Sequence, residues 1–457
     1  MARTLATVAT AAEHLPSKPN QALSHLPGPK GHWLGGNVAG LLGNIGAYVH
    51  AQQAEHGDCF TVGLFRNRRV VMLVGPEANE LVLLDREQNF SSRMGWDALL
   101  DFFGRNVLLR DFDDHRQHRR LMTHVFKPQP LARYLKQMNP TIQRALVDYH
   151  GDVEVYARTK QLALAIAIEV FAGIADGSDT QVWNRDLNLV LSNAMAHKIR
   201  LPCTRFSRGL AAKRRVHRRL LSLLPARREH GGDDLFSQLA SQQDEAGTVL
   251  SDADVIDHMF GMLFAAHDTT ASSLAMICWL LGRYPVWQER LRAECQNLAR
   301  KLDGRDLSYA DLDQLVQVEW VFKEALRMYA PLQLIPRRSV VPFEFSGHRI
   351  PENTALYLIP QAVHMNPEYY PDPHTFDPTR FAPVADGTKN ADPFTFVPFG
   401  RGSHMCLGMH FAYMEIKAVV YQLLLSRRLT VPDETLALEY LPIVRPTKPM
   451  VVYFEPI

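Results

Sequence analysis

One stretch of the chain decides how the rest is interpreted: FVPFGRGSHMCLGMHFA, residues 396–412. A single cysteine, Cys406, lies here among glycines, directly before an apolar pattern with helical spacing. At a helix N-terminus the free N–H groups and the helix dipole favour an anion, so they lower the pKa of a thiol. Gly400, Gly402 and Gly408 leave room for a flat object against the backbone. The stretch therefore favours an ionised thiol and leaves space for a flat ligand beside it.

Several interpretations of Cys406 stay open from this stretch alone. The thiolate could be a nucleophile, a redox sensor or a metal ligand, and a lone cysteine is most often only a small buried apolar side chain. Spacing fixes no base partner for a nucleophile, although the chain has 19 histidines. A protected thiolate could also be the axial ligand of a haem iron, to which it donates electron density.

The composition is that of a globular protein with a large core. The chain has 457 residues, of which 46% are hydrophobic and 21% are charged. The net charge of +2 gives no reason to expect nucleic acid as a partner. The five cysteines are scattered without a C-x-x-C pair, which argues against a zinc site or a disulfide framework and favours a reducing compartment. No run of eighteen apolar residues occurs, so we expect no transmembrane anchor.

The chain divides into a leader and a single domain. Residues 1–26 predict a flexible leader, and the Pro/Gly-dense stretch around Pro27–Pro29 predicts a stiff turn into the fold. Residues 59–74 alternate and break at a polar turn, which predicts a β-hairpin. From Pro76 to about Leu326 the pattern is almost wholly helical. We therefore expect one mainly α domain with small β-sheets over residues 27–457.

The clearest helix is expected to begin after Ser251, which can cap it, and to end at Pro285. Its length of about 33 residues corresponds to about 50 Å. Residues 259–281 are apolar nearly all round, which indicates burial through the centre of the domain.

Asp268 and Thr269 interrupt the apolar middle of this helix. An unpaired carboxylate there costs several kcal/mol unless it is paired or neutralised. One interpretation is a solvated notch, or a threonine hydroxyl bonded back to the carbonyl one turn earlier. The other is an acid–alcohol pair that opens the helix locally, as a π-bulge does, and delivers protons through water to a bound ligand.

A charge network is expected around Glu324. Arg327 lies three residues further along a predicted helix, and such a pair alone is weak evidence. Arg380 lies in a proline-broken loop and could bind the other carboxylate oxygen of Glu324.

Together these segments resemble the cytochrome P-450 haem-thiolate monooxygenases over about residues 27–457. The segment from Phe399 to Gly408 is similar to the family signature F-x-x-G-x-[RH]-x-C-x-G at every fixed position. Glu324-Ala-Leu-Arg327 resembles the family's E-x-x-R, and FDPTRF, with Arg380, resembles its PERF loop. Ala265–Thr270 resembles the oxygen-binding A-G-x-[DE]-T-T, and all four segments stand in family order. The resemblance implies a mainly α fold with small β-sheets and a long central helix over the haem.

Carried over residue by residue, the resemblance makes Cys406 the thiolate ligand of the iron in haem b. Four basic residues match family positions that bind the haem propionates: His115, Arg119, Arg337 and His404. Two propionates need several cations, and Arg338 is the rival of Arg337 for this role. The other implied haem contacts lie beside the thiolate or in the oxygen-binding groove: Pro398, Phe399, Gly408, Ala265 and Thr269.

The resemblance also assigns Asp268 and Thr269 as the catalytic acid–alcohol pair, and the network around Glu324 as structural. One departure is Ala266, which stands where the family usually has glycine. Its extra methyl should narrow the groove above the iron.

Residues 91–109 lie where the family has its variable substrate loop. There and in the segment PLQLIP, apolar side chains are candidates for the substrate lining: Trp96, Phe102, Phe103 and Leu334. The alternative is that the aromatic residues are merely core. An apolar lining favours a terpenoid, sterol-like, retinoid or fatty substrate.

The implied reaction is insertion of one oxygen atom of O₂ into such a substrate. No flavin or nucleotide-binding module is visible, so electrons from NAD(P)H should arrive through a ferredoxin and a ferredoxin reductase, or through a flavodoxin-type donor. The resemblance is to soluble, bacterial-type members, which implies a cytoplasmic monomer. The alternatives are a peroxygenase or isomerase, which usually lacks the acid–alcohol pair, and a non-catalytic haem protein.

A basic face is expected for an acidic ferredoxin. Arg116, Arg120 and Lys127 would form it on the thiolate side, near Arg401. The alternative is that Arg116 and Arg120 pair with the acidic residues at 111–114. This face would then have no net positive electrostatic field.

Overall fold

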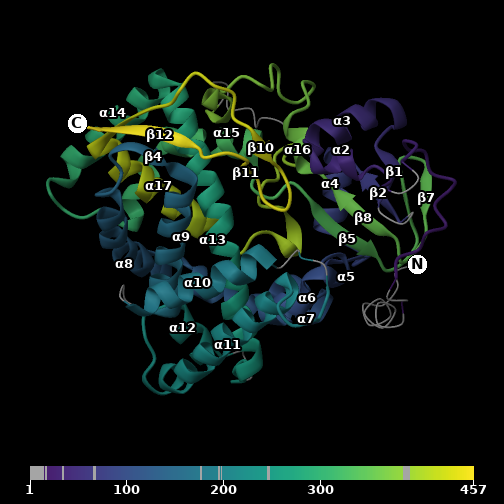
Figure 1. Ribbon diagram of the computed structural model, residues 1–457, viewed down its shortest axis with the longest axis horizontal. Coiled ribbons are helices and arrows are strands. Elements are labelled where there is room, and N and C mark those ends of the chain that lie inside the picture. The colour runs from purple at the N-terminus through teal and green to yellow at the C-terminus, as the bar shows by residue number, and fades with distance from the viewer. Residues whose placement is uncertain are drawn as a thin grey trace.

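Most of the helices gather in one part of the molecule, and a small β-sheet with some helices around it forms another (Figure 1). The computed structural model describes residues 15, 18–32, 35–64, 68–174, 178–193, 196, 198–243, 247–383 and 392–457. The longer helices are α3 (Ile45–His56), α4 (Pro76–Leu84), α7 (Phe112–Thr123), α8 (Pro128–Leu146), α9 (Val155–Ala172), α10 (Ser178–Asn193), α11 (Arg205–His230), α13 (Asp252–Arg283), α14 (Pro285–Leu302), α15 (Val316–Tyr329) and α17 (Met409–Ser426).

Short helical segments connect them: α2 (Val38–Leu42), α5 (Ser92–Gly95), η2 (Asp97–Leu99), α6 (Leu100–Phe103), η3 (Val107–Leu109), η4 (His124–Phe126), α12 (Leu235–Ser241), η5 (Tyr309–Gln314), α16 (Pro360–His364), η6 (Pro378–Phe381) and η7 (Gly402–His404). The strands are β1 (Cys59–Gly63), β2 (Arg69–Leu73), β3 (Phe90–Ser91), β4 (Gly151–Glu154), β5 (Ile335–Ser339), β6 (Phe343–Phe345), β7 (His348–Ile350), β8 (Ala355–Leu358), β9 (Arg427–Thr430), β10 (Leu438–Glu439), β11 (Arg445–Pro446) and β12 (Val451–Pro456).

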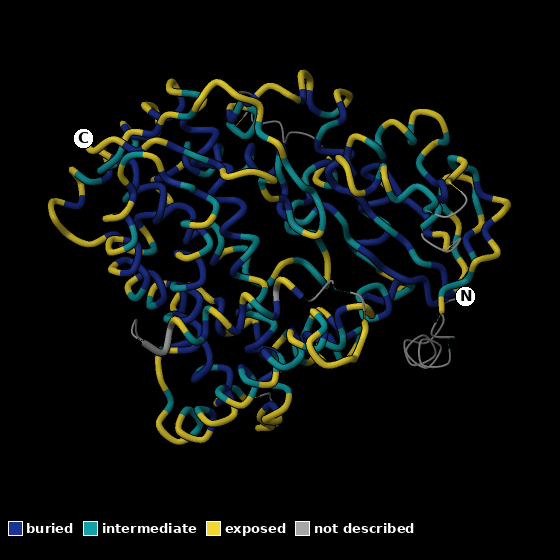
Figure 2. Tube along the Cα trace, viewed as in Figure 1, coloured by how far each residue is buried: buried dark blue, intermediate teal, exposed yellow. Residues whose placement is uncertain are grey.

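Helix α13 is the long central helix that the sequence predicts. It has 32 residues, and the Ser251 side chain accepts a hydrogen bond from the Asp254 N–H at its start. Every residue from Thr270 to Gly282 is buried, and Figure 2 shows the dark blue core around it. The helix is α-helical throughout, so the local opening weighed for Asp268 is absent. A helix without a bulge can still hold a polar pair if its neighbours satisfy it.

The predicted hairpin is present and belongs to a larger sheet. Strands β1 and β2 pair antiparallel, with Cys59 opposite Leu73, inside a five-stranded sheet of order β1-β2-β8-β5-β3. Both faces of β2 are covered, because Val71 packs in a cluster with α4 and Met72 packs in a cluster with α3.

The chain is already packed before the expected domain boundary at residue 27. Leu23 and Leu26 are buried in the cluster that covers one face of the sheet. The Asn20 N–H donates to the Asn353 carbonyl at 2.7 Å. The flexible leader predicted over 1–26 is therefore wrong for residues 18–26, while residues 1–14 and 16–17 lie outside the described residues.

Two strands interrupt the region predicted as almost wholly helical. Strand β3 pairs with β5, and β4 pairs with β12 near the C-terminus. These strands have two and four residues, and distant partners hold them, so local periodicity carried no signal for them.

Candidate active site

The loop before α17 presents Cys406 in a tightly held turn. The Cys406 N–H donates to the Phe399 carbonyl at 2.8 Å, and Gly408 is the N-cap of the helix. Gly402 has a φ of +67°, and a Cβ there would lie 2.0 Å from the Leu83 carbonyl oxygen of α4. Only glycine fits this approach, so the loop is clamped against the sheet side of the molecule.

The thiol of Cys406 differs from the expectation in its pKa. Its side chain is reached by solvent, but it is densely surrounded by protein. This enclosure raises the pKa, while the N–H of Gly408 and the charge of Arg119 act in the opposite direction. The lowering predicted from the helix dipole is therefore outweighed. A thiol of this kind is a poor free nucleophile, but a bound metal cation would displace its proton.

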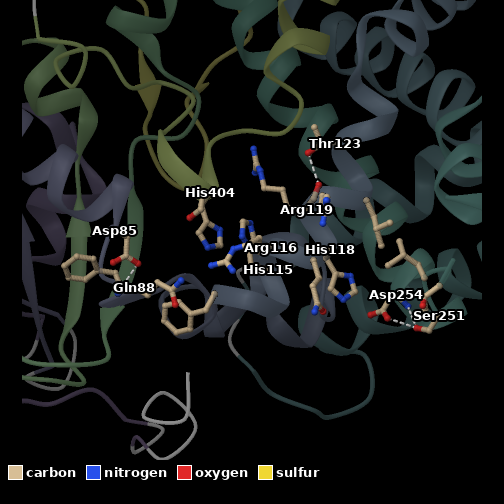
Figure 3. Close-up of a pocket in the computed structure, with 18 of the residues that line it drawn as sticks. Asp85, Gln88, His115, Arg116, His118, Arg119, Thr123, Ser251, Asp254 and His404 are labelled. Carbon is tan, nitrogen blue, oxygen red and sulfur yellow. Dashed lines mark hydrogen bonds between the residues drawn. The ribbon is translucent and has the colours of Figure 1, made fainter. Parts of the chain in front are cut away.

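Four basic side chains converge beside this loop. His115 and Arg119 come from α7, Arg337 comes from β5, and His404 comes from η7, as Figure 3 shows for His115, Arg119 and His404. The rings of His115 and His404 stack, with centroids 3.8 Å apart and planes at 28°. Burial, followed by the charges of Arg119 and Arg337, lowers the pKa of His115 to about 4. Burial likewise holds the pKa of His404 well below its usual value.

Two of these cations have no carboxylate partner in the part of the chain that the structure describes. Among the described residues no carboxylate lies within ion-pair distance of Arg119 or Arg337, although Arg337 is only 5% exposed. Burial lowers the pKa of Arg337 to about 10. Asp85 acts on it only at longer range, and burial raises the Asp85 pKa to about 7. Buried guanidinium groups need anions, so the arrangement fits the two propionates of a haem whose iron meets Cys406.

Arg338 lies beside Arg337 in sequence but is engaged elsewhere. Its guanidinium forms an ion pair with Asp97 of η2, with Nη2 3.2 Å from Oδ2. This contact favours Arg337 over Arg338 as the arginine that binds a haem propionate.

A cavity of about 1070 Å³ runs along α7 beside this cluster. It is lined by residues of the segments 84–90, 112–123 and 248–254 and by Ser403 and His404 (Figure 3). Two contacts near it tie α7 and the segment just before α7 to α13. His118 Nδ1 lies 2.9 Å from His258 Nε2, and Arg110 pairs with Asp254. These contacts, which sequence reasoning missed, fix the helix that carries His115 relative to the central helix.

The middle of α13 holds the predicted acid–alcohol pair. The Thr269 hydroxyl donates to the Ala265 carbonyl at 2.6 Å, which is the local bond weighed from the sequence. The Asp268 carboxylate pairs with Lys160 of α9, with Nζ 2.8 Å from Oδ1. The sequence showed that Asp268 needed a partner, but nothing in it identified Lys160.

The predicted network around Glu324 is present, with Glu324 and Arg327 fully buried and Arg380 partly exposed. Arg327 donates to both carboxylate oxygens of Glu324 at 2.8 Å, and both side chains are 0% exposed. Arg380 approaches Oε1 at 3.5 Å, so it shares an oxygen with Arg327 instead of taking the second one alone. Arg327 also donates to the carbonyls of His364 and Pro373. The network thereby joins α15 to the segment that leads into the Cys406 loop.

The candidate substrate residues are not brought together as one lining. Phe103 packs on Phe264 of α13, with ring centroids 4.0 Å apart, one residue before Ala265. Phe102 packs edge-on against Phe206 of α11 in the core. Leu334 packs against the separate cluster of α3 and the sheet, and Trp96 is half-buried against the main core. Phe264 was missed, although its place next to Ala265 was a usable signal.

Comparisons with known proteins decide the family. The model of the cytochrome P-450 family matches residues 26–201 and 187–454 of the chain.

The chain belongs to the cytochrome P-450 family.

A protein of Mycobacterium tuberculosis named as a cytochrome P-450 is 34% identical over 369 residues, which cover 79% of this chain and 74% of that protein. Taxane 10-beta-hydroxylase of Taxus cuspidata is 28% identical and covers 86% of this chain and 82% of its own length. A solved cyanobacterial P-450 with bound retinoic acid has a TM-score of 0.84, at 26% identity, over 95% of this chain and 100% of that one.

These matches confirm the expected fold class and the oxidoreductase class. The protein is a cytochrome P-450 monooxygenase, and the family implies a haem-thiolate iron as its cofactor. In the part of the chain that the structure describes, no helix combines the length and apolarity needed to cross a bilayer.

Proposed function

We propose that this P-450 inserts one oxygen atom of O₂ into an apolar substrate, with Cys406 as the ligand of a haem b iron. The observation that carries the assignment is the convergence of Arg119 and Arg337 beside the Cys406 loop: Arg119 is half-buried, Arg337 is buried, and neither has a carboxylate partner among the described residues. When bound, the haem-thiolate iron supplies the activation of dioxygen.

The residues of the chain hold and shield the haem. His115, Arg119, Arg337 and His404 would bind its propionates, with the two buried imidazoles neutral and donating N–H groups. Pro398, Phe399 and Gly408 would pack beside Cys406, whose N–H is already committed to the Phe399 carbonyl.

The groove side is formed by α13. Ala265 and Thr269 would line the oxygen-binding groove, and the methyl of Ala266 would narrow it. Asp268 would take protons from water. The Thr269 hydroxyl would hold in place the group that donates the last proton. Because peroxygenases and isomerases of this family usually lose the acid–alcohol pair, its presence here favours the monooxygenase.

Two observations support an apolar substrate. Phe264 in the middle of α13 packs its ring against that of Phe103, next to the residues Ala265–Thr269 that would line the groove. The relatives include a taxane hydroxylase and a structure bound to retinoic acid. We therefore favour a terpenoid or retinoid, ahead of sterol-like and fatty compounds. Binding of each class to the haem-loaded protein is read from the shift of its Soret band.

Electrons would come from NAD(P)H through a ferredoxin and its reductase, or through a flavodoxin-type donor. Arg116 forms an ion pair with Asp113 at 2.7 Å, so it adds little net field. Lys127 is exposed beyond the end of α7, and Arg401 stacks on Phe394 at the other side of the loop. Lys127→Glu should raise the apparent KM for an acidic ferredoxin and leave peroxide-driven turnover unchanged.

The first test is the carbon monoxide difference spectrum of the reduced protein. A strongly red-shifted Soret band is expected for thiolate ligation, and a band typical of histidine-ligated haem would overturn the assignment of Cys406. Substrate-dependent NAD(P)H consumption with a reductase system then separates a monooxygenase from a non-catalytic haem protein. Turnover with peroxide alone would favour the peroxygenase.

A further inference from the structure

A hydrogen bond between two histidine rings joins α7 to the central helix. His118 Nδ1 lies 2.9 Å from His258 Nε2. His258 is 0% exposed, and His118 lies at the edge of the cavity that runs along α7 (Figure 3). Between two neutral imidazoles, one ring donates an N–H and the other accepts with a bare nitrogen. The direction of the bond therefore decides which nitrogen of each ring carries the proton.

Both rings are uncharged at neutral pH. Burial lowers the pKa of His258 to about 3, and burial likewise lowers the pKa of His118. Two carboxylates act on the rings in the opposite direction, from Asp114 on α7 and Asp254 on α13. Each already forms an ion pair with Arg110, which limits how far it favours a charged imidazole.

The contacts of His118 favour one direction of the bond. Its Nε2 lies 3.5 Å from Asp114 Oδ1, and a carboxylate favours an N–H on the nitrogen that faces it. A neutral ring with its proton on Nε2 has a bare Nδ1, which can only accept a hydrogen bond. His118 is therefore the acceptor.

The surroundings of His258 give the same direction. Its Nδ1 is buried and has no hydrogen-bond partner among the residues that the structure describes. A proton on Nδ1 would be a buried N–H without an acceptor, which costs more than a bare nitrogen without a donor. The proton thus belongs on Nε2, from which it is donated to His118 Nδ1.

The bond acts on the helix that carries two of the proposed propionate ligands. On α7, His118 follows His115 by less than one turn and directly precedes Arg119. Two further polar contacts with α13 come from the segment just before α7, through Arg105 and Arg110. They hold the chain before the helix begins, so His118 adds a restraint on the rotation of α7 about its own axis.

Building on the proposed haem site, we propose that His118 and His258 are positioning residues, in which the His258 Nε2–H donates to His118 Nδ1 and sets the rotation of α7 against α13. This rotation holds His115 and Arg119 toward the propionates of a bound haem. Without the bond α7 turns more freely, so the haem is held less tightly although neither His118 nor His258 is one of the proposed propionate ligands.

The first experiment compares two amides at position 118. Asparagine places its amide near the position of Nδ1, and glutamine places it near that of Nε2. His118→Asn keeps an acceptor for His258 and should release haem within about twofold of the wild-type rate. His118→Gln loses that acceptor and should release haem about fivefold faster, which corresponds to about 1 kcal/mol at about 1.36 kcal/mol per tenfold. Transfer of haem to an excess of apomyoglobin measures the rate.

The same comparison is made from the other ring. His258→Gln keeps a donor near Nε2 and should stay close to the wild type, whereas His258→Phe keeps a ring without the donor and should match His118→Gln. The double variant His118→Gln/His258→Phe should release haem no faster than either single variant, because each removes the same bond. His124→Gln is the control, since His124 is exposed in η4 just after α7.

The second experiment reads the proton positions without turnover. In the diamagnetic ferrous carbon monoxide form, the NMR shifts of the imidazole nitrogens distinguish a protonated nitrogen from a bare one. His118→Asn and His258→Gln assign the two rings. Both rings should be neutral, with the proton on Nε2.

The outcomes separate the inference from the function on which it rests. Equal haem release from His118→Asn and His118→Gln, whether slow or fast, would overturn the positioning role. A proton on Nδ1 of either ring, or a charged ring at neutral pH, would overturn the direction of the bond. A haem-loaded wild type that forms no product counts against the monooxygenase alone, and a wild type that takes up no haem overturns the haem site and the positioning role together.

Discussion

The imidazole of His115 on α7 stacks on that of His404 in the Cys406 loop, with ring centroids 3.8 Å apart. The two rings come from segments far apart in the chain, and the charge of Arg337 acts on both, with His115 buried and His404 half-buried. Each ring excludes water from the other, so the pair forms one wall of the proposed propionate site. Removing either ring should open that wall.

His404→Ala should therefore release haem about tenfold faster, corresponding to a loss of about 1.4 kcal/mol, close to the lower end of the range for one hydrogen bond to a charged group. The rate is measured by transfer of haem to an excess of apomyoglobin. His374→Ala is the control, because His374 is exposed. Equal release rates for His404→Ala and wild type would exclude a role for this ring.

Cys406→Ser should keep the fold but lose the thiolate-type carbon monoxide spectrum and the monooxygenase activity, because a neutral hydroxyl is a poor ligand for the iron. Circular dichroism checks the fold and the spectrum checks ligation. Cys203→Ser removes an exposed cysteine elsewhere and should change neither. Unchanged turnover in Cys406→Ser would end the assignment.

Glu324→Ala should yield little haem-loaded protein. The substitution leaves the guanidinium of Arg327 buried without its carboxylate, at a cost of about 3–5 kcal/mol. The measurement is the yield of holoprotein and its urea midpoint. Glu289→Ala, which removes a half-exposed carboxylate paired with Arg292, should have little effect. Wild-type yields of Glu324→Ala would show that the network is dispensable.

Thr269→Ala should keep substrate binding while diverting electrons to peroxide, because the Thr269 hydroxyl no longer holds the group that donates the proton. The readout is product formed per NAD(P)H consumed. Ser273→Ala is a close control, since the Ser273 hydroxyl makes the same kind of bond one turn later, to the Thr269 carbonyl at 3.1 Å. An unaltered ratio in Thr269→Ala would argue against the acid–alcohol pair.

The stability of the protein should fall steeply with acid. The buried ring of His364 accepts a hydrogen bond from the Val397 N–H at 3.1 Å, which requires an unprotonated Nε2, and burial lowers its pKa to about 3. An unfolded histidine has a pKa of about 6.5, so the unfolded state binds more protons between the two values. The contribution of His364 is fully present above about pH 6.5 and is lost progressively as the pH falls toward 3.

His364→Gln should therefore flatten the dependence of unfolding free energy on pH between 6.5 and 4, by up to about 1.4 kcal/mol per pH unit. Denaturant titrations at several pH values measure the slope. His374→Gln, at an exposed position, should keep the wild-type slope. An identical slope in both variants would contradict the assignment.

Local patterns predicted those features that are set by neighbouring residues. The Ser251 cap and the Glu324–Arg327 pair each depend on residues three positions apart, and the hairpin pairs Cys59 with Leu73 within one short segment. The motif around Cys406 also gave its place before a helix. Burial raises the pKa of its thiol, against the lowering that the local helix dipole predicts.

Contacts between distant helices escaped prediction. Lys160 meets Asp268, and His118 meets His258, only because the fold brings their helices together. No spacing rule selects such partners from the many charged residues of the chain. The buried Leu23 was missed for a related reason, since its partner is a sheet built from later strands.

The network of Arg327 also bears on how the protein acquires its cofactor. Its guanidinium donates a hydrogen bond to the His364 carbonyl. The His364 ring in turn accepts a hydrogen bond from the Val397 N–H, just before Phe399 in the chain. These bonds tie down the entrance to the Cys406 loop using the protein's own atoms. The conformational entropy of this segment is therefore lost during folding, before the haem binds. The haem then binds to a preformed site. Cofactor loading should then resemble ligand binding to a rigid pocket, with little of the coupled folding seen when a metal organises its own site.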